Sequence, residues 1–363
     1  MKRGAIVLGS YVVLATIVLG IWARATRTEK VGRGDDEPYY SLSNFSKMVD
    51  GTAPTPFVLR RLLPDSANFL AHQIPESCWN ALKEFLEGDS YPARRMKALL
   101  DYLGWEPEHY PEVFCGYFLI WLSIIGFMFA VRQLARFYYE MPDRVADVLG
   151  GLFGIGLLGG SDSLWHGGYT YDFPNAFVFV LCLYGIVASR WWLLPTFILA
   201  CYSKETALLL IIAYGLVHRA DYRQLRFVLM LAVMAGIYFA IRTWINQNYQ
   251  TPPADHYWYP KRNLGVLAKA AVFGMWWVFV GAVVCLRIWQ IRRQVPLDLR
   301  LLLIMGVLMV GAAFFQAWIE ERRQYLEVYP IVGLIVLQWA SVELGLTHLF
   351  RPRVPQIEVS QQT

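Results

Sequence analysis

The sequence predicts an all-α protein, a polytopic transmembrane bundle of about 9 or 10 membrane segments with a large first outer loop. Hydrophobic residues make up 56% of the 363 residues and charged residues only 17%, whereas a soluble domain carries about a quarter charged residues. Several apolar runs have the length of about 20 residues that a helix needs to cross a bilayer. The 14 Trp and 21 Tyr suit the aromatic belts at membrane surfaces.

The first apolar run follows Lys2 and Arg3 and covers residues 5–23. It could be a signal peptide, but it is long for a signal-peptide core and no clear small-x-small cleavage site precedes the polar stretch. We therefore expect a retained first helix. The expected membrane segments are, in order, 5–23, 114–133, 145–160, 173–189, 191–217, 225–245, 265–287, 300–318 and 328–349.

Lysine and arginine in short loops predict the orientation of these segments. Lys2 and Arg3 place the N-terminus in the cytoplasm. The later basic loops can all face the cytoplasm only if residues 191–217 begin and end on the same side, as a hairpin with the SKE sequence at its turn. The alternative is one continuous 27-residue helix with a buried Lys-Glu pair. The basic loops contain Arg132, Arg136, Arg144, Arg190, His218, Arg219, Arg223, Arg226, Arg287, Arg292, Arg293, Arg300, Arg351 and Arg353.

This orientation divides the chain into four parts. Residues 1–23 are the first transmembrane helix, 24–113 an extracytoplasmic loop, 114–350 the transmembrane bundle and 351–363 a cytoplasmic tail. The loop is too long for a simple connector. We expect it to form a lid of amphipathic jaw helices on the outer mouth of the bundle, from helical patterns near 57–72, 76–88 and 93–104.

An acidic turn, GDDEPYYSL at residues 34–42, follows the first helix. Asp35, Asp36 and Glu37 are consecutive carboxylates. A carboxylate held at a membrane surface can act as a general base or orient a hydroxyl for attack. The alternative interpretation is a solvated acidic turn with no catalytic role.

Two basic residues in apolar stretches are candidate anion-binding groups. Arg60 lies in TPFVLRRLLP (55–64), and arginine binds phosphate through paired hydrogen bonds. Snorkelling of Arg60 to the lipid headgroups is the alternative. Lys204, in the SKE turn, could also bind an anion, with Glu205 as its partner. A charged pair at this depth is tolerated where it lines a water-filled cavity.

Two more outer segments contribute candidates. The glycines and aromatics of SDSLWHGGYTYDFP (161–174) surround Asp162, His166 and Asp172 and suit a sugar ring. An interfacial aromatic belt is the alternative there. The stretch IEERRQYLEVYP (319–330) precedes the last helix, and its adjacent arginines suit a phosphate or diphosphate, unless they form only an interfacial charge cluster. Its candidate residues are Arg322, Arg323 and Tyr325.

Several chemistries lack support in the sequence. There is no Walker loop, no GxSxG and no GxGxxG after a strand. The histidines and acids do not fall at tight metal-ligand spacing, and we expect no metal or other cofactor. The five Cys are scattered and suit packing. The net charge of +5 comes largely from short loops, so we expect no nucleic-acid partner.

Taken in order, these motifs resemble the GT-C superfamily of integral-membrane glycosyltransferases, which use polyprenyl-phosphate-linked sugars. The similarity is weak in identity but covers most of the chain. The acidic motif Asp35–Tyr40 is similar to the family's first outer-loop aspartate. The family's PF-x-x-R-x-L-L-P, YDFP, SKE and R-x-x-x-x-x-x-P runs resemble Pro56–Pro64, Tyr171–Pro174, Ser203–Thr206 and Arg322–Pro330.

The resemblance implies transfer of a sugar from polyprenyl phosphate to a glycan, lipid or protein acceptor on the extracytoplasmic face of a bacterial inner membrane. Asp35 or Asp36 would be the catalytic base. Two other functions stay open: a transporter of a lipid-linked saccharide, and a polysaccharide polymerase or assembly partner. The implied substrate-binding residues are Arg60, His166, Asp172, Lys204, Glu205, Arg322, Arg323 and Tyr325.

Overall fold

The computed structural model confirms the all-α class. It describes residues 2–28, 43–53, 55, 57–103, 107–160, 170–249, 258–273, 283, 285–316 and 325–353. Within these residues the only strands are β1 (Tyr139–Glu140) and β2 (Arg351–Pro352). They pair antiparallel, with Tyr139 opposite Pro352. The helices up to the middle of the chain are α1 (Lys2–Thr28), α2 (Ser43–Val49), η2 (Phe57–Leu59), α3 (Leu62–Gln73), α4 (Glu76–Glu87), α5 (Tyr91–Leu103), η3 (Pro107–His109), α6 (Tyr110–Tyr138), α7 (Asp143–Gly160) and α8 (Asp172–Val187).

The second half of the chain continues in the same way. Its helices are α9 (Leu193–Ser203), η4 (Glu205–Ala207), α10 (Leu208–Val217), η5 (Arg219–Asp221), α11 (Leu225–Asn248), α12 (Pro260–Phe273), α14 (Leu297–Gln316), α15 (Tyr329–Glu343) and η7 (Thr347–Leu349).

Four of the described helices are long and apolar enough to cross a membrane, and they lie in α1, α6, α11 and α14. Four shorter apolar helices cover Asp172–Val187, Leu193–Ser203, Glu205–Val217 and Tyr329–Glu343. Large apolar side chains are exposed along α1 and α11, including Ile6 and Phe239. Such surface is unusual for a water-exposed helix. The arrangement is therefore compatible with an integral membrane protein.

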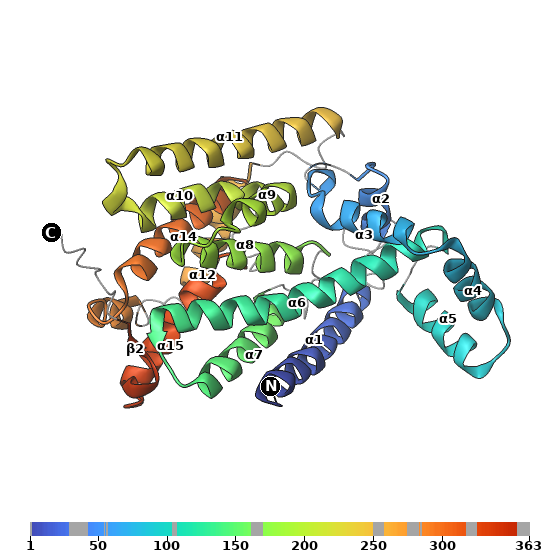
Figure 1. Ribbon diagram of the computed structural model, residues 1–363, viewed down its shortest axis with the longest axis horizontal. Helices are drawn as coiled ribbons and strands as arrows, with labels where there is room; N and C mark the ends of the chain where they lie inside the picture. Colours follow the sequence, from blue (N-terminus) through green and yellow to red (C-terminus); the bar gives the residue numbers. More distant parts are fainter. Residues whose placement is uncertain are drawn as a thin grey trace.

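Helix α6 lies at the centre of the fold. It packs against α1, α3, α7 and α8, and Figure 1 shows α1 and α7 on one side of it and α8 on the other. Beyond α8 come α9 and α10, and then α11. The α6 side chains Ile124, Phe127 and Met128 are fully buried, which explains how this long apolar helix can serve as the core of the bundle.

Residues 191–217 form a hairpin, as the charge pattern predicts. The backbone at Lys204 is extended, with φ −158° and ψ 152°, and separates α9 from η4 and α10. At the other end of the hairpin, His218 Nε2 donates to the carbonyl oxygen of Ile186 at 3.1 Å, so α10 ends beside the end of α8. Helix α9 also begins there, where Leu193 N donates to the carbonyl oxygen of Arg190 at 3.1 Å. The continuous-helix alternative is therefore wrong.

The segment between α1 and α6 is helical where its pattern predicts. The expected helices near 57–72, 76–88 and 93–104 correspond to η2 with α3, to α4 and to α5. Helix α3 packs on α6, while α4 and α5 form a pair at the right edge of Figure 1. Trp79 Nε1 of α4 donates to the carbonyl oxygen of Ala71 in α3 at 3.1 Å, which links this pair to the rest of the molecule.

An ion network holds together the start of α1, the end of α6 and the start of α7, at the end of the bundle opposite α4 and α5. Arg3 pairs with Asp143 at 2.9 Å and with Asp147 at 2.7 Å. Arg132 also pairs with Asp147, at 2.6 Å, and Arg136 with Asp143, at 3.0 Å. The start of α1, the end of α6 and the start of α7 therefore lie together, so Arg3, Arg132 and Arg136, three of the basic residues that predict one common side, share one end of the fold.

Candidate functional site

Charged side chains converge where five elements meet: η2, the start of α8, the α9–η4–α10 turn, the end of α11 and the segment before α15. All of them except Glu205 are buried. We call this set the charged cluster. It lies at the far end of α1 from the Arg3 network, because it adjoins the start of α8, where Phe173 packs on Trp22 near the end of α1 with 5.6 Å between the ring centroids. The members of the charged cluster are Arg60, Asp172, Lys204, Glu205, Arg242 and Glu327.

Arg60 follows the short helix η2, whose tight turn is closed by Arg60 N donating to the carbonyl oxygen of Phe57 at 3.1 Å. Its Nη2 donates to Glu205 Oε1 at 2.9 Å and its Nη1 to the hydroxyl of Tyr171. The guanidinium carbon lies 4.4 Å from the centre of the Tyr171 ring. Burial lowers the pKa of Arg60, but Glu205, Tyr171 and Asp172 together raise it above its ordinary value. Arg60 is thus a permanent buried cation.

Arg242 approaches the same carboxylate from α11. Its Nη2 lies 3.9 Å from Glu205 Oε2, and its Nη1 donates to the carbonyl oxygen of Leu59 at 3.1 Å. Tyr238 lies one turn earlier on α11 and donates its hydroxyl to the carbonyl oxygen of Glu205 at 3.2 Å. Two guanidinium groups from separate elements therefore flank the side chain of Glu205.

Glu327 is the acceptor for the other half of the cluster. Its side chain is 0% exposed, and its Oε1 accepts hydrogen bonds from Lys204 Nζ at 2.6 Å, Asn175 Nδ2 at 2.7 Å and Thr206 Oγ1 at 3.0 Å. Its Oε2 has no hydrogen-bond donor among the described residues. Through Glu327, the hairpin turn is joined to the start of α8 and to the segment before α15.

Lys204 and Glu205 do not pair with each other, contrary to the sequence-based hypothesis. Lys204 pairs with Glu327 and Glu205 with Arg60. The extended backbone at Lys204 explains this, because successive side chains of an extended chain point in opposite directions. The hairpin turn therefore presents a cation to one neighbour and an anion to another.

The snorkelling interpretation of the Arg60 stretch is also wrong. Arg60 is 9% exposed and Arg61 3% exposed, and both have protein partners. Arg61 donates to the carbonyl oxygen of Met48 and to Asp65. Asp65 also accepts a hydrogen bond from the hydroxyl of Tyr202 at 2.9 Å. Asp65 thereby links α3 to α9, next to the charged cluster.

Of the sequence-predicted site residues, the structure brings Arg60, Asp172, Lys204 and Glu205 together. Asp172 is 3% exposed and begins α8 directly after Tyr171, the partner of Arg60. Tyr325 is partly buried and lies two residues before Glu327. The predictions for Asp35, Asp36, His166, Arg322 and Arg323 lie outside the described residues.

Sequence reasoning missed three members of this site: Arg242, Glu327 and Asn175. Arg242 had a usable signal, because it is the only charged residue within the apolar run 228–249 and an unpaired charge in such a run is costly. Glu327 lies in the quoted stretch IEERRQYLEVYP, where the adjacent arginines drew attention instead. Asn175 carries no charge, so nothing in the apolar start of α8 distinguishes it.

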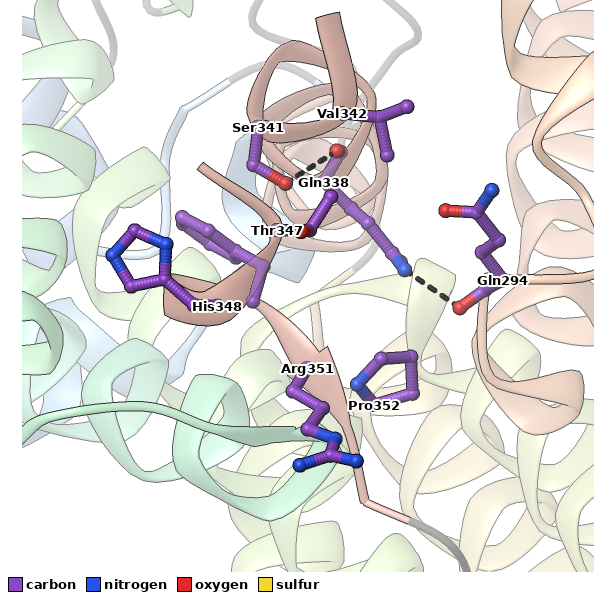
Figure 2. A pocket seen from close by; sticks show the side chains of 9 residues that line it. Gln294, Gln338, Ser341, Val342, Thr347, His348, Arg351 and Pro352 are labelled. Atoms are coloured by element: carbon purple, nitrogen blue, oxygen red, sulfur yellow. Dashed lines mark hydrogen bonds between the residues drawn. The ribbon is translucent and has the colours of Figure 1, made fainter. Parts of the chain in front are cut away.

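A polar pocket lies at the other end of α15 (Figure 2). Its volume is about 320 Å³. Gln338, which lines it, donates to the carbonyl oxygen of Gln294 at 2.6 Å and accepts from the hydroxyl of Tyr139 at 2.8 Å. None of the sequence-predicted site residues lines this pocket, and the amide of Gln338 already has protein partners, so the charged cluster is the stronger candidate site.

Comparisons with known proteins give no relative. The chain matches no protein-family model, no curated protein and no solved structure.

Proposed function

We propose that this chain is an integral-membrane glycosyltransferase of the GT-C type, which transfers a sugar from a polyprenyl-phosphate donor to a glycan, lipid or protein acceptor. The observation that carries the proposal is the charged cluster. Arg60, Asp172, Lys204 and Glu205 come from three motifs that the resemblance assigns to substrate binding, and they meet in one largely buried site although Arg60 and Glu205 are 145 residues apart. That convergence is expected if the motifs act on one ligand.

The wider architecture under this proposal is a multi-pass protein of a bacterial inner membrane, active on the extracytoplasmic face. Helices α4 and α5 would be the jaw helices of a lid formed by residues 24–113. The position of the charged cluster supports this arrangement. It lies at the end of the bundle where α6 begins, opposite the Arg3 network. Helices α4 and α5 and the candidate site therefore share one end of the bundle.

In this reaction a carboxylate, Asp35 or Asp36, takes the proton of the acceptor hydroxyl as that oxygen attacks the anomeric carbon. A bond forms between this oxygen and the anomeric carbon. The bond from that carbon to the phosphate oxygen breaks, and the polyprenyl phosphate leaves with the electron pair. The growing charge on the phosphate requires cationic partners. Arg60 and Arg242 suit this role because both face the single carboxylate of Glu205, whereas Lys204 has the carboxylate of Glu327 as its own partner.

The first experiment measures donor binding. We would reconstitute the chain in nanodiscs and compare its thermal unfolding with polyprenyl monophosphate and with polyprenol, which lacks the phosphate. We expect only the phosphate to raise the unfolding temperature, and Arg60→Ala to abolish the shift. Arg223→Ala is the control, because Arg223 is exposed at the opposite end. Absence of any shift in the folded wild-type chain would contradict the proposal.

The second experiment separates transfer from transport. The broken hairpin is a feature that transporters also use, so binding alone does not distinguish the two functions. We expect polyprenyl-phosphate sugar to be converted to polyprenyl phosphate, and either Asp35→Ala or Asp36→Ala to remove this activity at normal expression. Movement of intact donor across the membrane without conversion would favour the transporter.

A further inference from the structure

We propose that Glu205 is an internal stand-in for a phosphate: its carboxylate occupies a two-arginine anion site, made by Arg60 and Arg242, from which the ligand displaces it. The inference rests on the proposed function, because it takes a phosphate to be the ligand. It adds a second arginine to the site and assigns Glu205 the role of a competitor.

The two arginines hold this carboxylate incompletely. Arg60 makes one hydrogen bond to it, at 2.9 Å, but the Arg242 nitrogen stays 3.9 Å away, beyond hydrogen-bond distance. Glu205 Oε2 and Arg60 Nε are both buried, and neither has a hydrogen-bond partner in the part of the chain that the structure describes. A phosphate offers more acceptor oxygens than a carboxylate and suits the planar guanidinium fork. The site therefore has more donor capacity than Glu205 uses.

Charge gives a second argument. Among the described residues the cluster contains three cations, Arg60, Lys204 and Arg242, and three acids, Asp172, Glu205 and Glu327. Their ordinary charges cancel. A phosphate added to this cluster would make it negative, and like charges in a buried site repel strongly. One carboxylate must therefore leave or take up a proton when the anion arrives.

Glu205 is the acid best able to leave. Its side chain is 43% exposed, whereas that of Glu327 is 0% exposed and Asp172 is 3% exposed. It also lies at the turn of the hairpin, in the short helix η4. Glu327 accepts three hydrogen bonds, so its displacement would leave three donors without an acceptor.

The test compares phosphate affinity across variants in nanodiscs. The probes are polyprenyl monophosphate in the bilayer, and inorganic phosphate and diphosphate in the buffer, which separate a lipid source from a soluble one. Glu205→Gln keeps the shape and removes the competing charge, so we expect it to bind phosphate about tenfold more tightly. Arg242→Gln should bind about tenfold more weakly. The matched control is Asp298→Asn, which breaks the 2.9 Å ion pair with Arg219 and should change nothing.

Unchanged or weaker binding by folded Glu205→Gln would overturn the proposal, since Glu205 would then serve to hold the arginines in place. If that variant does not fold, Glu205→Asp decides, because its shorter side chain withdraws from Arg60 and should also tighten binding. If the wild-type chain binds polyprenyl phosphate but these variants do not bind it more tightly, the stand-in role of Glu205 is rejected and the proposed function is retained. If the variants bind only inorganic phosphate more tightly, the stand-in role of Glu205 is retained and a lipid-linked donor is rejected. Binding of no probe by any variant would contradict both.

Discussion

At the scale of single residues, the most demanding interaction is the ion pair between Lys204 and Glu327. Lys204 is 7% exposed and Glu327 0% exposed. Charges at this depth lose most of their hydration, and they are tolerated only when each is paired and hydrogen-bonded. Lys204 Nζ reaches Glu327 Oε1 at 2.6 Å. Removing either partner would therefore leave an uncompensated charge inside the protein.

We expect Glu327→Ala to lower the free energy of unfolding by about 3–5 kcal/mol, because it leaves Lys204 buried without a counter-charge. The double variant Lys204→Met/Glu327→Leu should recover most of that loss, since it removes both charges. The measurement is a denaturant titration in mixed micelles. The control is Glu343→Ala, at a site 45% exposed, where about 0–1 kcal/mol is expected. A loss in the double variant as large as in the single one would contradict the ion-pair explanation.

The sequence predicted some residues of this site but not how they pair. Lys204 and Glu205 were identifiable because charges in an apolar run require partners. Their partners were not, because Glu327 is 123 residues away from Lys204 and Arg60 is 145 residues away from Glu205. Adjacency in the sequence suggested the wrong pair. Only the extended backbone at Lys204 separates the two side chains.

At the scale of elements, the glycines of α7 determine how closely it packs. A Cβ added at Gly150 would lie 2.7 Å from the carbonyl oxygen of Met128 and would also clash with the hydroxyl of Tyr11. That carbonyl belongs to the backbone of α6, which cannot move aside as a flexible side chain can. Gly150 is therefore required for the close approach of α7 to α6 and α1.

We expect Gly150→Ala to destabilise the protein by about 1–3 kcal/mol through overpacking. Gly236→Ala in α11 is the matched control. A Cβ there meets nothing within 4 Å, so the change should stabilise the helix by about 0.5–1 kcal/mol. Both values follow from the same titration. Equal effects of the two substitutions would show that α7 does not pack on α6 as closely as described.

The helices of the segment before α6 could be predicted from sequence, but their packing could not. Pro and Gly punctuation located α3, α4 and α5 within a few residues. Helix α3 is held against α2 by Arg61, which donates to the carbonyl oxygen of Met48. A side chain that donates to a backbone carbonyl leaves no signal in the sequence of its partner.

At the scale of the whole molecule, seven of the nine expected segments coincide with four long apolar helices and four shorter ones. The segment 145–160 coincides with α7, and much of 265–287 lies outside the described residues. Hydropathy located the runs, and short-loop charge predicted the hairpin at 191–217. Neither hydropathy nor short-loop charge predicted the lengths of the helices. The short helices bury their apolar faces against neighbouring helices and do not each cross a membrane as a single full-length span. Helix α8, at 16 residues, extends only about 24 Å, and its side chains Phe173 and Phe179 are buried within the fold.

The hairpin makes a prediction about sidedness, because it places η5 and α4 at opposite ends of the bundle. Cys78 on α4 and Cys285 are exposed, whereas Cys115, Cys182 and Cys201 are buried. In a Cys285→Ser chain, we expect Cys78 to react with a membrane-impermeant maleimide added to intact cells. Arg223→Cys, in a chain also lacking Cys78 and Cys285, should react only after the membrane is permeabilised.

The chain that lacks only Cys78 and Cys285 is the control for this labelling. It should take no label while folded, because its three remaining cysteines are buried. A continuous helix at 191–217 would move Arg223 to the same side as Cys78, since one crossing fewer separates them. Labelling of both positions in intact cells would therefore contradict the hairpin in the membrane. Labelling of Cys78 alone would place α4, and with it the end of the bundle that holds the charged cluster, on the extracytoplasmic side.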